Sequence, residues 1–148
     1  MPTSFLHPFA RPSREDFIRL VSGNGSTVTD ADGNDYLDAM ASLWYCNVGH
    51  GRREIAEATA AQMTTLEAYS CFDPFTNERA EELTARVADL APIDDGRVFL
   101  CGSGSEAVDT AMKIARLTQV LAGDPDRNVI ISRMRGYHGT NYGGTSAQ

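Results

Sequence analysis

Apolar residues recur at helical spacing in three stretches of the chain, residues 55–66, 80–90 and 105–121. In the third stretch the apolar positions 108, 111, 112 and 115 fall on one face, as in an amphipathic helix. Pro92 and Gly123 follow the second and third stretches, where helix-ending residues are expected. The spacing therefore predicts three helices, the last of them running from Ser105 to Leu121.

Two short runs of apolar β-forming residues flank this third helix, Val98–Cys101 before it and Val129–Ile131 after it. A continuous apolar run is typical of a strand that is covered on both faces, as in a parallel sheet. A strand, a helix and a second strand over roughly 30 residues make a βαβ unit with a right-handed crossover. The pattern therefore predicts the beginning of an α/β domain.

The first part of the chain shows a different pattern. Residues 26–29 and 36–38 are short β-prone runs on either side of Asp30–Asn34, which contains the turn-forming pair Asp32-Gly33. This arrangement predicts a β-hairpin. Residues 1–14 hold three prolines among apolar side chains, which predicts either an extended arm or a frayed terminus.

Composition and charge narrow the possible partners. The 148 residues carry 13 cationic and 20 acidic side chains, a formal charge of −7, and no basic stripe, which argues against nucleic acid and anionic membranes. No stretch approaches the roughly 18 apolar residues of a membrane span. Three widely spaced cysteines fit neither a zinc site nor a disulfide framework, so we expect no metal, reduced thiols and a cytoplasmic protein.

The turn after the first predicted strand, residues 101–107, is the leading candidate for a binding site. It lies where open α/β sheets bind ligands, and its glycines let a ligand approach the backbone. The following helix directs N–H groups and a partial positive charge at this point, which favours a phosphate. The alternative is a plain glycine turn in which Ser105 is only the N-cap of the helix.

Tyr137, His138 and Gly139 follow the second predicted strand, so we expect them at the same sheet edge as the 101–107 turn. A tyrosine there can stack on a planar ring, which indicates an aromatic cofactor with one phosphate. His138 could instead be an ordinary hydrogen-bonded loop imidazole. The turn also fits a dinucleotide-binding fingerprint, which expects a carboxylate after the second strand. Arg133 and Arg135 stand there and would suit a 2′-phosphate, so an NADP-dependent oxidoreductase is the alternative.

Taken in order, these motifs resemble those of the class III aminotransferases, which are fold-type I enzymes that use pyridoxal 5′-phosphate (PLP). The omega-transaminase branch is the most similar. The resemblance implies an α/β fold in which residues 1–52 form an arm and a small-domain hairpin segment. Residues 53–148 would then start the PLP-binding large domain, including the first βαβ unit of its sheet. The matching segments are Asp32–Asp38, Leu43–His50, Arg97–Phe99, Gly104–Asp109 and Gly136–Gly139.

The resemblance also implies roles for individual residues. Gly104 and Ser105 match the positions that hold the PLP phosphate, Tyr137 matches the aromatic residue on the pyridine ring, and His138 completes that motif. Trp44 matches an aromatic wall of the substrate pocket. Phe72 matches a segment that reaches the pocket of the neighbouring subunit in a homodimer. Gly102 departs from the family, which often has Asn or Thr there.

The implied activity moves an amino group from an amine or amino acid to a keto acid such as pyruvate. In this family a lysine forms the Schiff base with PLP, and no lysine here matches it. Lys113 is the single lysine, and it lies about 12 Å along the helix from the phosphate turn. We therefore expect no catalytic residue within this chain, which would be the leading, and by itself inactive, part of a longer protein. A non-catalytic module that only associates with other chains is the remaining alternative.

Overall fold

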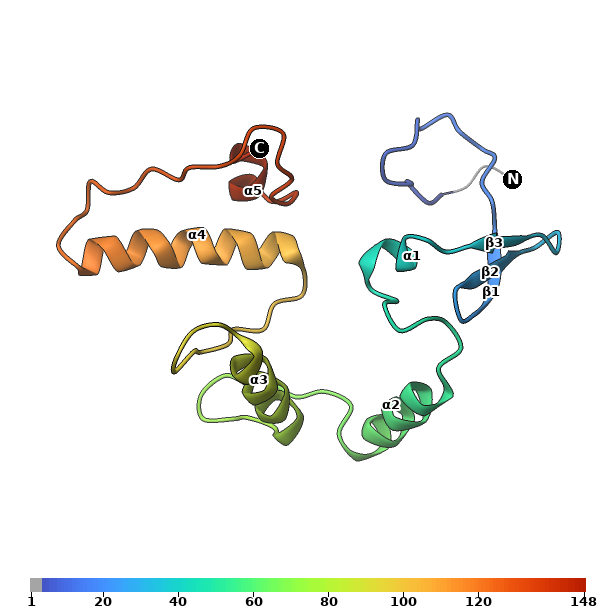
Figure 1. The fold of residues 1–148 in the computed structure, drawn as a ribbon, viewed down its shortest axis with the longest axis horizontal. Coiled ribbons are helices and arrows are strands. Elements are labelled where there is room, and N and C mark those ends of the chain that lie inside the picture. The colour runs from blue at the N-terminus through green and yellow to red at the C-terminus, as the bar shows by residue number, and fades with distance from the viewer. Residues whose placement is uncertain (1–3) are drawn as a thin grey trace. The chain divides into compact units, whose positions relative to one another are not determined.

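The computed structural model describes residues 4–148, which fall into two compact units. One unit reaches to Tyr69 and the other runs from Ser70 to Gln148, and each is described by itself. Figure 1 labels the strands and helices that build them.

A three-stranded antiparallel sheet dominates the first unit, with strand order β1-β2-β3 (Figure 1). Its strands are β1 (Leu20–Asn24), β2 (Thr27–Asp30) and β3 (Asp35–Leu37). The predicted hairpin is confirmed as β2–β3. Strand β1 was not predicted, because it contains Gly23 and a register irregularity between Leu20 and Ser22 in place of a regular alternation.

The carboxylate of Asp30 closes the hairpin turn. It accepts hydrogen bonds from the backbone N–H groups of Asp32 at 2.9 Å and Asn34 at 2.8 Å, and from the Tyr36 hydroxyl at 2.7 Å. With 6% of its surface exposed, Asp30 is the one buried charged residue in the part of the chain described. The hydrogen bonds, above all those from Asn34, lower the pKa of Asp30 to about 2.

The N-terminal segment differs from the predicted extended arm as far as it is described, from residue 4 onward. Backbone hydrogen bonds from Ala10 to His7 and from Arg14 to Arg11 turn the chain back on itself. The His7 ring stacks on Phe17 at 3.6 Å, and the Arg14 guanidinium lies 5.2 Å from the centre of the Phe17 ring. These turns and ring contacts bring side chains together that an extended arm would keep apart.

Two helical elements follow β3 in the first unit. The predicted helix over 55–66 is confirmed as α2 (Arg53–Thr65). Before it lies α1 (Ala41–Trp44), a single turn in which all four residues have positive φ. No sequence pattern predicted this turn.

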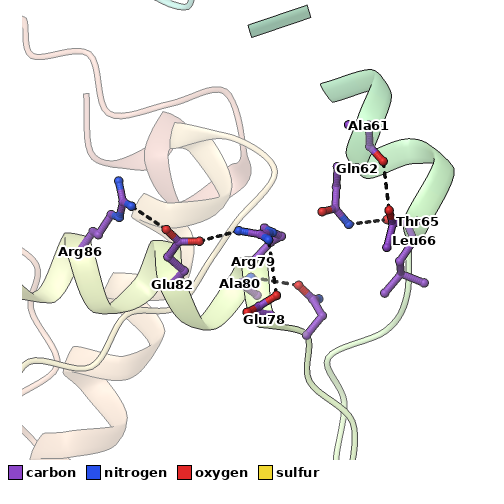
Figure 2. A network of polar contacts seen from close by, with 10 residues as sticks. Ala61, Gln62, Thr65, Leu66, Glu78, Arg79, Ala80, Glu82 and Arg86 are labelled. Atoms are coloured by element: carbon purple, nitrogen blue, oxygen red, sulfur yellow. Dashed lines mark hydrogen bonds and ion pairs between the residues drawn. The ribbon is translucent and has the colours of Figure 1, made fainter. Parts of the chain in front are cut away.

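The second unit begins with the predicted helix over 80–90, which is α3 (Glu78–Leu90). The Asn77 side chain caps it by accepting a hydrogen bond from the Ala80 N–H at 2.9 Å. Figure 2 shows the charged side chains on its surface. The Glu82 carboxylate forms ion pairs with the guanidinium groups of Arg79 and Arg86, with N···O distances of 2.8 and 2.5 Å. These pairs are exposed and one helical turn apart, so each contributes little to stability.

Helix α4 (Gly104–Leu121) confirms the third predicted helix, and the short α5 (Tyr142–Ser146) packs near its beginning (Figure 1). The prediction of a strand on either side of α4 was wrong. Residues 98–101 and 129–131 flank the helix as expected, but neither forms a β-ladder within residues 4–148. A strand exists only with a hydrogen-bonded neighbour, and apolar composition alone does not supply one.

No large apolar side chain among the described residues is buried. The apolar faces of α3 and α4 are open, with Leu83 49% and Leu117 57% exposed. No helix in residues 4–148 is long and apolar enough to cross a membrane. Local hydrogen bonds and close backbone contacts, rather than a core, therefore fix the geometry of the candidate site within each unit.

Candidate functional site

The beginning of α4 is shaped by Ser103, which is the N-cap of the helix. Its hydroxyl accepts a hydrogen bond from the Glu106 N–H at 3.2 Å, and its carbonyl accepts one from the Ala107 N–H at 3.0 Å. The alternative in which Ser105 was only the helix cap is therefore wrong. Ser105 lies inside the first turn, and its hydroxyl is available for another role.

That role is a contact with a segment 35 residues further along. The Ser105 hydroxyl accepts a hydrogen bond from the Thr140 N–H at 3.0 Å and lies 3.4 Å from the Thr140 hydroxyl. Gly139 has a φ of +116°, and a Cβ atom there would lie 2.9 Å from the Ser105 Cα. Only glycine fits both the angle and the contact. The Tyr137–Gly139 motif is thus held at the head of α4, as predicted.

A second anchor lies one helical turn further along α4. The Asp109 carboxylate accepts hydrogen bonds from the N–H groups of Gly144 at 2.9 Å and Gly143 at 3.4 Å. A Cβ atom on Gly144 would come within 2.4 Å of the His138 carbonyl oxygen, so this packing also requires glycine. Ser105 and Asp109 together fix residues 137–144 along the start of the helix.

Neither Thr140 nor the role of Asp109 followed from the sequence. The signal was present but weak: Ser105 and Asp109 are four positions apart on one helix face, and the segment after Tyr137 is rich in glycine. Such spacing shows that two side chains point the same way. It does not show which distant backbone they meet.

Tyr137 and His138 have contrasting environments in this segment. Tyr137 is 65% exposed, so its ring is free to cover a ligand. The Nε2 atom of His138 is buried and has no hydrogen-bond partner among the described residues, while a Cβ atom on Gly136 would lie 2.8 Å from it. A buried ring nitrogen without a partner favours a role beyond that of an ordinary loop imidazole.

The head of α4 has the chemistry of an anion site. First-turn N–H groups point out of the end of an 18-residue helix, beside the Ser103 and Ser105 hydroxyls. A Cβ atom on Gly104 would meet nothing within 4 Å, so there is room next to these donors. The Glu106 side chain turns back to accept a hydrogen bond from the Gly102 N–H at 2.9 Å, which fixes the turn. The arrangement can hold one phosphate group.

The two predicted pocket residues lie elsewhere. Phe72, 85% exposed, is in the loop before α3 and lines a groove together with Phe99 and Leu100. Trp44, 69% exposed, ends the α1 turn of the first unit. The second unit thus holds Gly104, Ser105, Tyr137, His138 and Phe72, and the first unit holds Trp44.

Residues 9–148 match the family described as aminotransferase class III. The chain belongs to this family. A beta-alanine–pyruvate aminotransferase of Pseudomonas aeruginosa is 42% identical over 141 residues, covering 94% of this chain and 31% of that protein. These similarities give no support to the NADP-dependent oxidoreductase.

Solved structures of transaminases have a fold similar to that of this chain. A PLP-bound amine transaminase from an uncultivated Pseudomonas species has a TM-score of 0.91 at 36% identity, covering 99% of this chain and 34% of that one. A thermostable omega transaminase with a tryptophan-to-glycine substitution, engineered for the synthesis of bulky amines, has a TM-score of 0.91 at 30% identity, with 97% and 32% covered. The predicted fold class, α/β fold-type I, is therefore confirmed. The chain spans about a third of the length of the curated relatives it matches.

Proposed function

We propose that this chain supplies the phosphate-binding and ring-binding part of a PLP-dependent aminotransferase. The observation that carries the proposal is the contact of Ser105 with Thr140 and Gly139, which holds the Tyr137 motif at the N-terminus of α4. The proposed phosphate-binding turn and the exposed ring of Tyr137 are thereby held at the same end of α4. The PLP-bound transaminase with the same fold supports this assignment.

The residues present fit PLP. Gly104 and Ser105 would hold the phosphate with backbone N–H groups and a hydroxyl, next to the open space at Gly104. Tyr137 would cover the pyridine ring, and the unpaired Nε2 of His138 would gain a polar neighbour. When bound, PLP withdraws electrons from the carbon that carries the amino group and so makes its proton easier to remove.

This chain's residues contribute binding and orientation to that chemistry. Phosphate contacts at Ser105 fix one end of the cofactor, and Tyr137 fixes the plane of its ring, so the reacting carbon has one defined position. Trp44 would be an aromatic wall of a substrate pocket and exclude water, and Phe72 would reach the pocket of the neighbouring subunit. No proton transfer is assigned to Lys113, whose place in α4 is about 12 Å from the phosphate seat.

The proposed reaction moves an amino group from an amine or amino acid to a keto acid such as pyruvate. The similar Pseudomonas aeruginosa enzyme, named for beta-alanine and pyruvate, supports this class of donor and acceptor. We include in the proposal a cytoplasmic homodimer in which the Phe72 segment reaches the neighbouring subunit's pocket.

The test uses the whole protein encoded by the gene that contains these residues. It should bind PLP, with a visible absorbance band that changes when an amine donor is added. Ser105→Ala should raise the Kd for PLP about tenfold, because a hydrogen bond to a charged group contributes roughly 1.5–3 kcal/mol. Thr118→Ala is the matched control, since it removes another hydroxyl of α4 that only contacts the Ile114 carbonyl. A colourless protein that binds NADPH would overturn the proposal.

A further inference from the structure

The α1 turn carries Trp44 in a conformation that its own residues disfavour. Ala41, Ser42, Leu43 and Trp44 have φ angles of +48°, +51°, +64° and +78°. The left-handed region crowds the Cβ atom against the backbone, and residues other than glycine visit it singly. Four such residues in a row need contacts from outside the turn to hold them.

Asp38 supplies these contacts. Its carboxylate accepts a hydrogen bond from the Ser42 N–H at 2.9 Å, and one oxygen lies 3.3 Å from the Ser42 hydroxyl. Backbone hydrogen bonds also close the turn, from Ala41 to Asp38, from Trp44 to Met40, and from Tyr45 and Cys46 to Ala41. Asp38 is thus the side chain that fixes the second residue of the left-handed turn.

His50 in turn orients Asp38 and ties it to the sheet. The His50 Nε2 atom lies 2.8 Å from the Asp38 carboxylate, and this contact is the main reason that the pKa of Asp38 is lowered. The His50 backbone exchanges two hydrogen bonds with Gly25, at 3.0 and 2.8 Å. Its ring packs so closely on β1 that a Cβ atom on Gly23 would lie 2.8 Å away.

A series of contacts through His50, Asp38 and Ser42 therefore joins the sheet to the turn that ends at Trp44. Both side chains of this contact are largely covered, His50 with 20% and Asp38 with 12% of the side chain exposed. A largely covered polar group costs free energy when its hydrogen-bond partner is removed and it is left unpaired. A change at Asp38 should consequently move the turn rather than leave it in place.

We propose that Asp38, oriented by His50, is a positioning residue that fixes Trp44 and thereby limits the size of the amine donor. The inference rests on the proposed aminotransferase function, in which Trp44 is a wall of the donor pocket. The relative engineered for bulky amines through a tryptophan-to-glycine change supports a link between a tryptophan and donor size. Here the link extends to two residues that do not touch the donor.

The experiment compares kcat/KM of the PLP-loaded whole protein for a small aliphatic amine and for a bulky arylalkyl amine. Asp38→Asn should raise the bulky-to-small ratio about tenfold, within the range that pocket shape can discriminate. His50→Gln should shift the ratio in the same direction by a smaller factor, and it carries the test if Asp38→Asn does not fold.

Two controls separate positioning from general damage. Asp30→Asn removes a comparable carboxylate network from the hairpin turn of the same sheet and should leave the ratio within about twofold of the wild type. In a Trp44→Ala background, Asp38→Asn should leave the ratio unchanged, because the side chain it positions is gone.

Each outcome has one meaning. An unchanged ratio in Asp38→Asn, an equal shift in Asp30→Asn, or a shift that persists without Trp44 would overturn the inference. These results would leave the aminotransferase proposal standing as long as the wild type transaminates the small amine. A wild type that binds PLP but transaminates no amine would instead contradict the proposed function.

Discussion

Two turns in this chain carry the candidate binding residues, and they are built in opposite ways. The turn at residues 102–107 obtains its shape from neighbours: Ser103 caps Glu106, and Glu106 reaches back to Gly102. The turn at residues 41–44 is left-handed without a single glycine, at a cost of roughly 1–2 kcal/mol per residue. Asp38 and His50, the latter six residues beyond the turn, have to hold it.

The difference predicts how each turn responds to substitution. No residue of 102–107 has a positive φ, and Ser105 also holds the Gly139–Thr140 segment, so a change there should act on ligand affinity, through the lost contact with the ligand or with that segment. At residues 41–44 the geometry depends on a polar network, so a change in the network alters the shape of the turn. Ligand affinity should therefore report on the first turn, and donor selectivity on the second.

The largest effect is expected from Gly139→Val, which attacks the contact that supports the first turn. The new side chain would meet Ser105 at 2.9 Å with φ at +116°, so the Tyr137 segment must move away from α4. We expect the whole protein to lose PLP on gel filtration, as measured by visible absorbance. The matched control is Gly123→Val, which has φ at +89° but no atom within 4 Å of the added Cβ. Equal loss of PLP in both variants would mean that backbone strain, not the contact with Ser105, is responsible.

The same contrast explains which parts of the fold the sequence could predict. The hairpin at Asp30–Asn34 and the helices α2, α3 and α4 depend on spacing, caps and turn residues that lie within a few positions of one another. The turn at residues 102–107 and the proximity of the Tyr137–Gly139 segment to it followed from the order of these elements. The strand β1 and the left-handed turn were missed, because both depend on partners that no local pattern specifies.

The errors have the same origin. Residues 98–101 and 129–131 have strand composition, yet a ladder needs a neighbouring strand and the described chain gives them none. The alternative in which Ser105 is only the helix cap was wrong for a similar reason: the cap is Ser103, and the preference for serine at such positions does not choose between two serines. The contacts of Thr140 with Ser105 and of Gly144 with Asp109 join residues 35 apart, beyond any periodic pattern.

An intermediate effect, on the melting temperature, is expected at the hairpin turn. A carboxylate holds this turn, as it does the left-handed turn, but the sequence predicts the hairpin. Hydrogen bonds lower the pKa of Asp30 to about 2, from an ordinary value near 4. A carboxyl with a lowered pKa stabilises the fold above its ordinary pKa, and this contribution is lost as the pH falls toward 2. Asp30→Asn should therefore lower the melting temperature at pH 6 and reduce the further loss between pH 4 and pH 2.

Melting curves of wild type and variant across that pH range provide the measurement. Asp35→Asn is the control, because the Asp35 carboxylate accepts a hydrogen bond from the Thr29 hydroxyl at 2.7 Å and stays exposed. It should lower the melting temperature less than Asp30→Asn at pH 6. A parallel pH dependence of wild type and Asp30→Asn would show that Asp30 does not hold the hairpin by its charge.

The smallest effect, on the donor ratio, is expected at Cys46. Its side chain contacts His50 but does not hold the left-handed turn in place. Its sulfur lies 3.5 Å from His50 Nδ1, on the far side of the imidazole from Asp38, and its backbone N–H already closes the turn at the Ala41 carbonyl. Cys46→Ser retains that backbone bond and a polar hydrogen near Nδ1. The bulky-to-small donor ratio should therefore stay within about twofold of the wild type, in contrast to the roughly tenfold change expected for Asp38→Asn. A shift in Cys46→Ser as large as that in Asp38→Asn would mean that the thiol, and not the carboxylate, orients His50 and sets the position of Trp44.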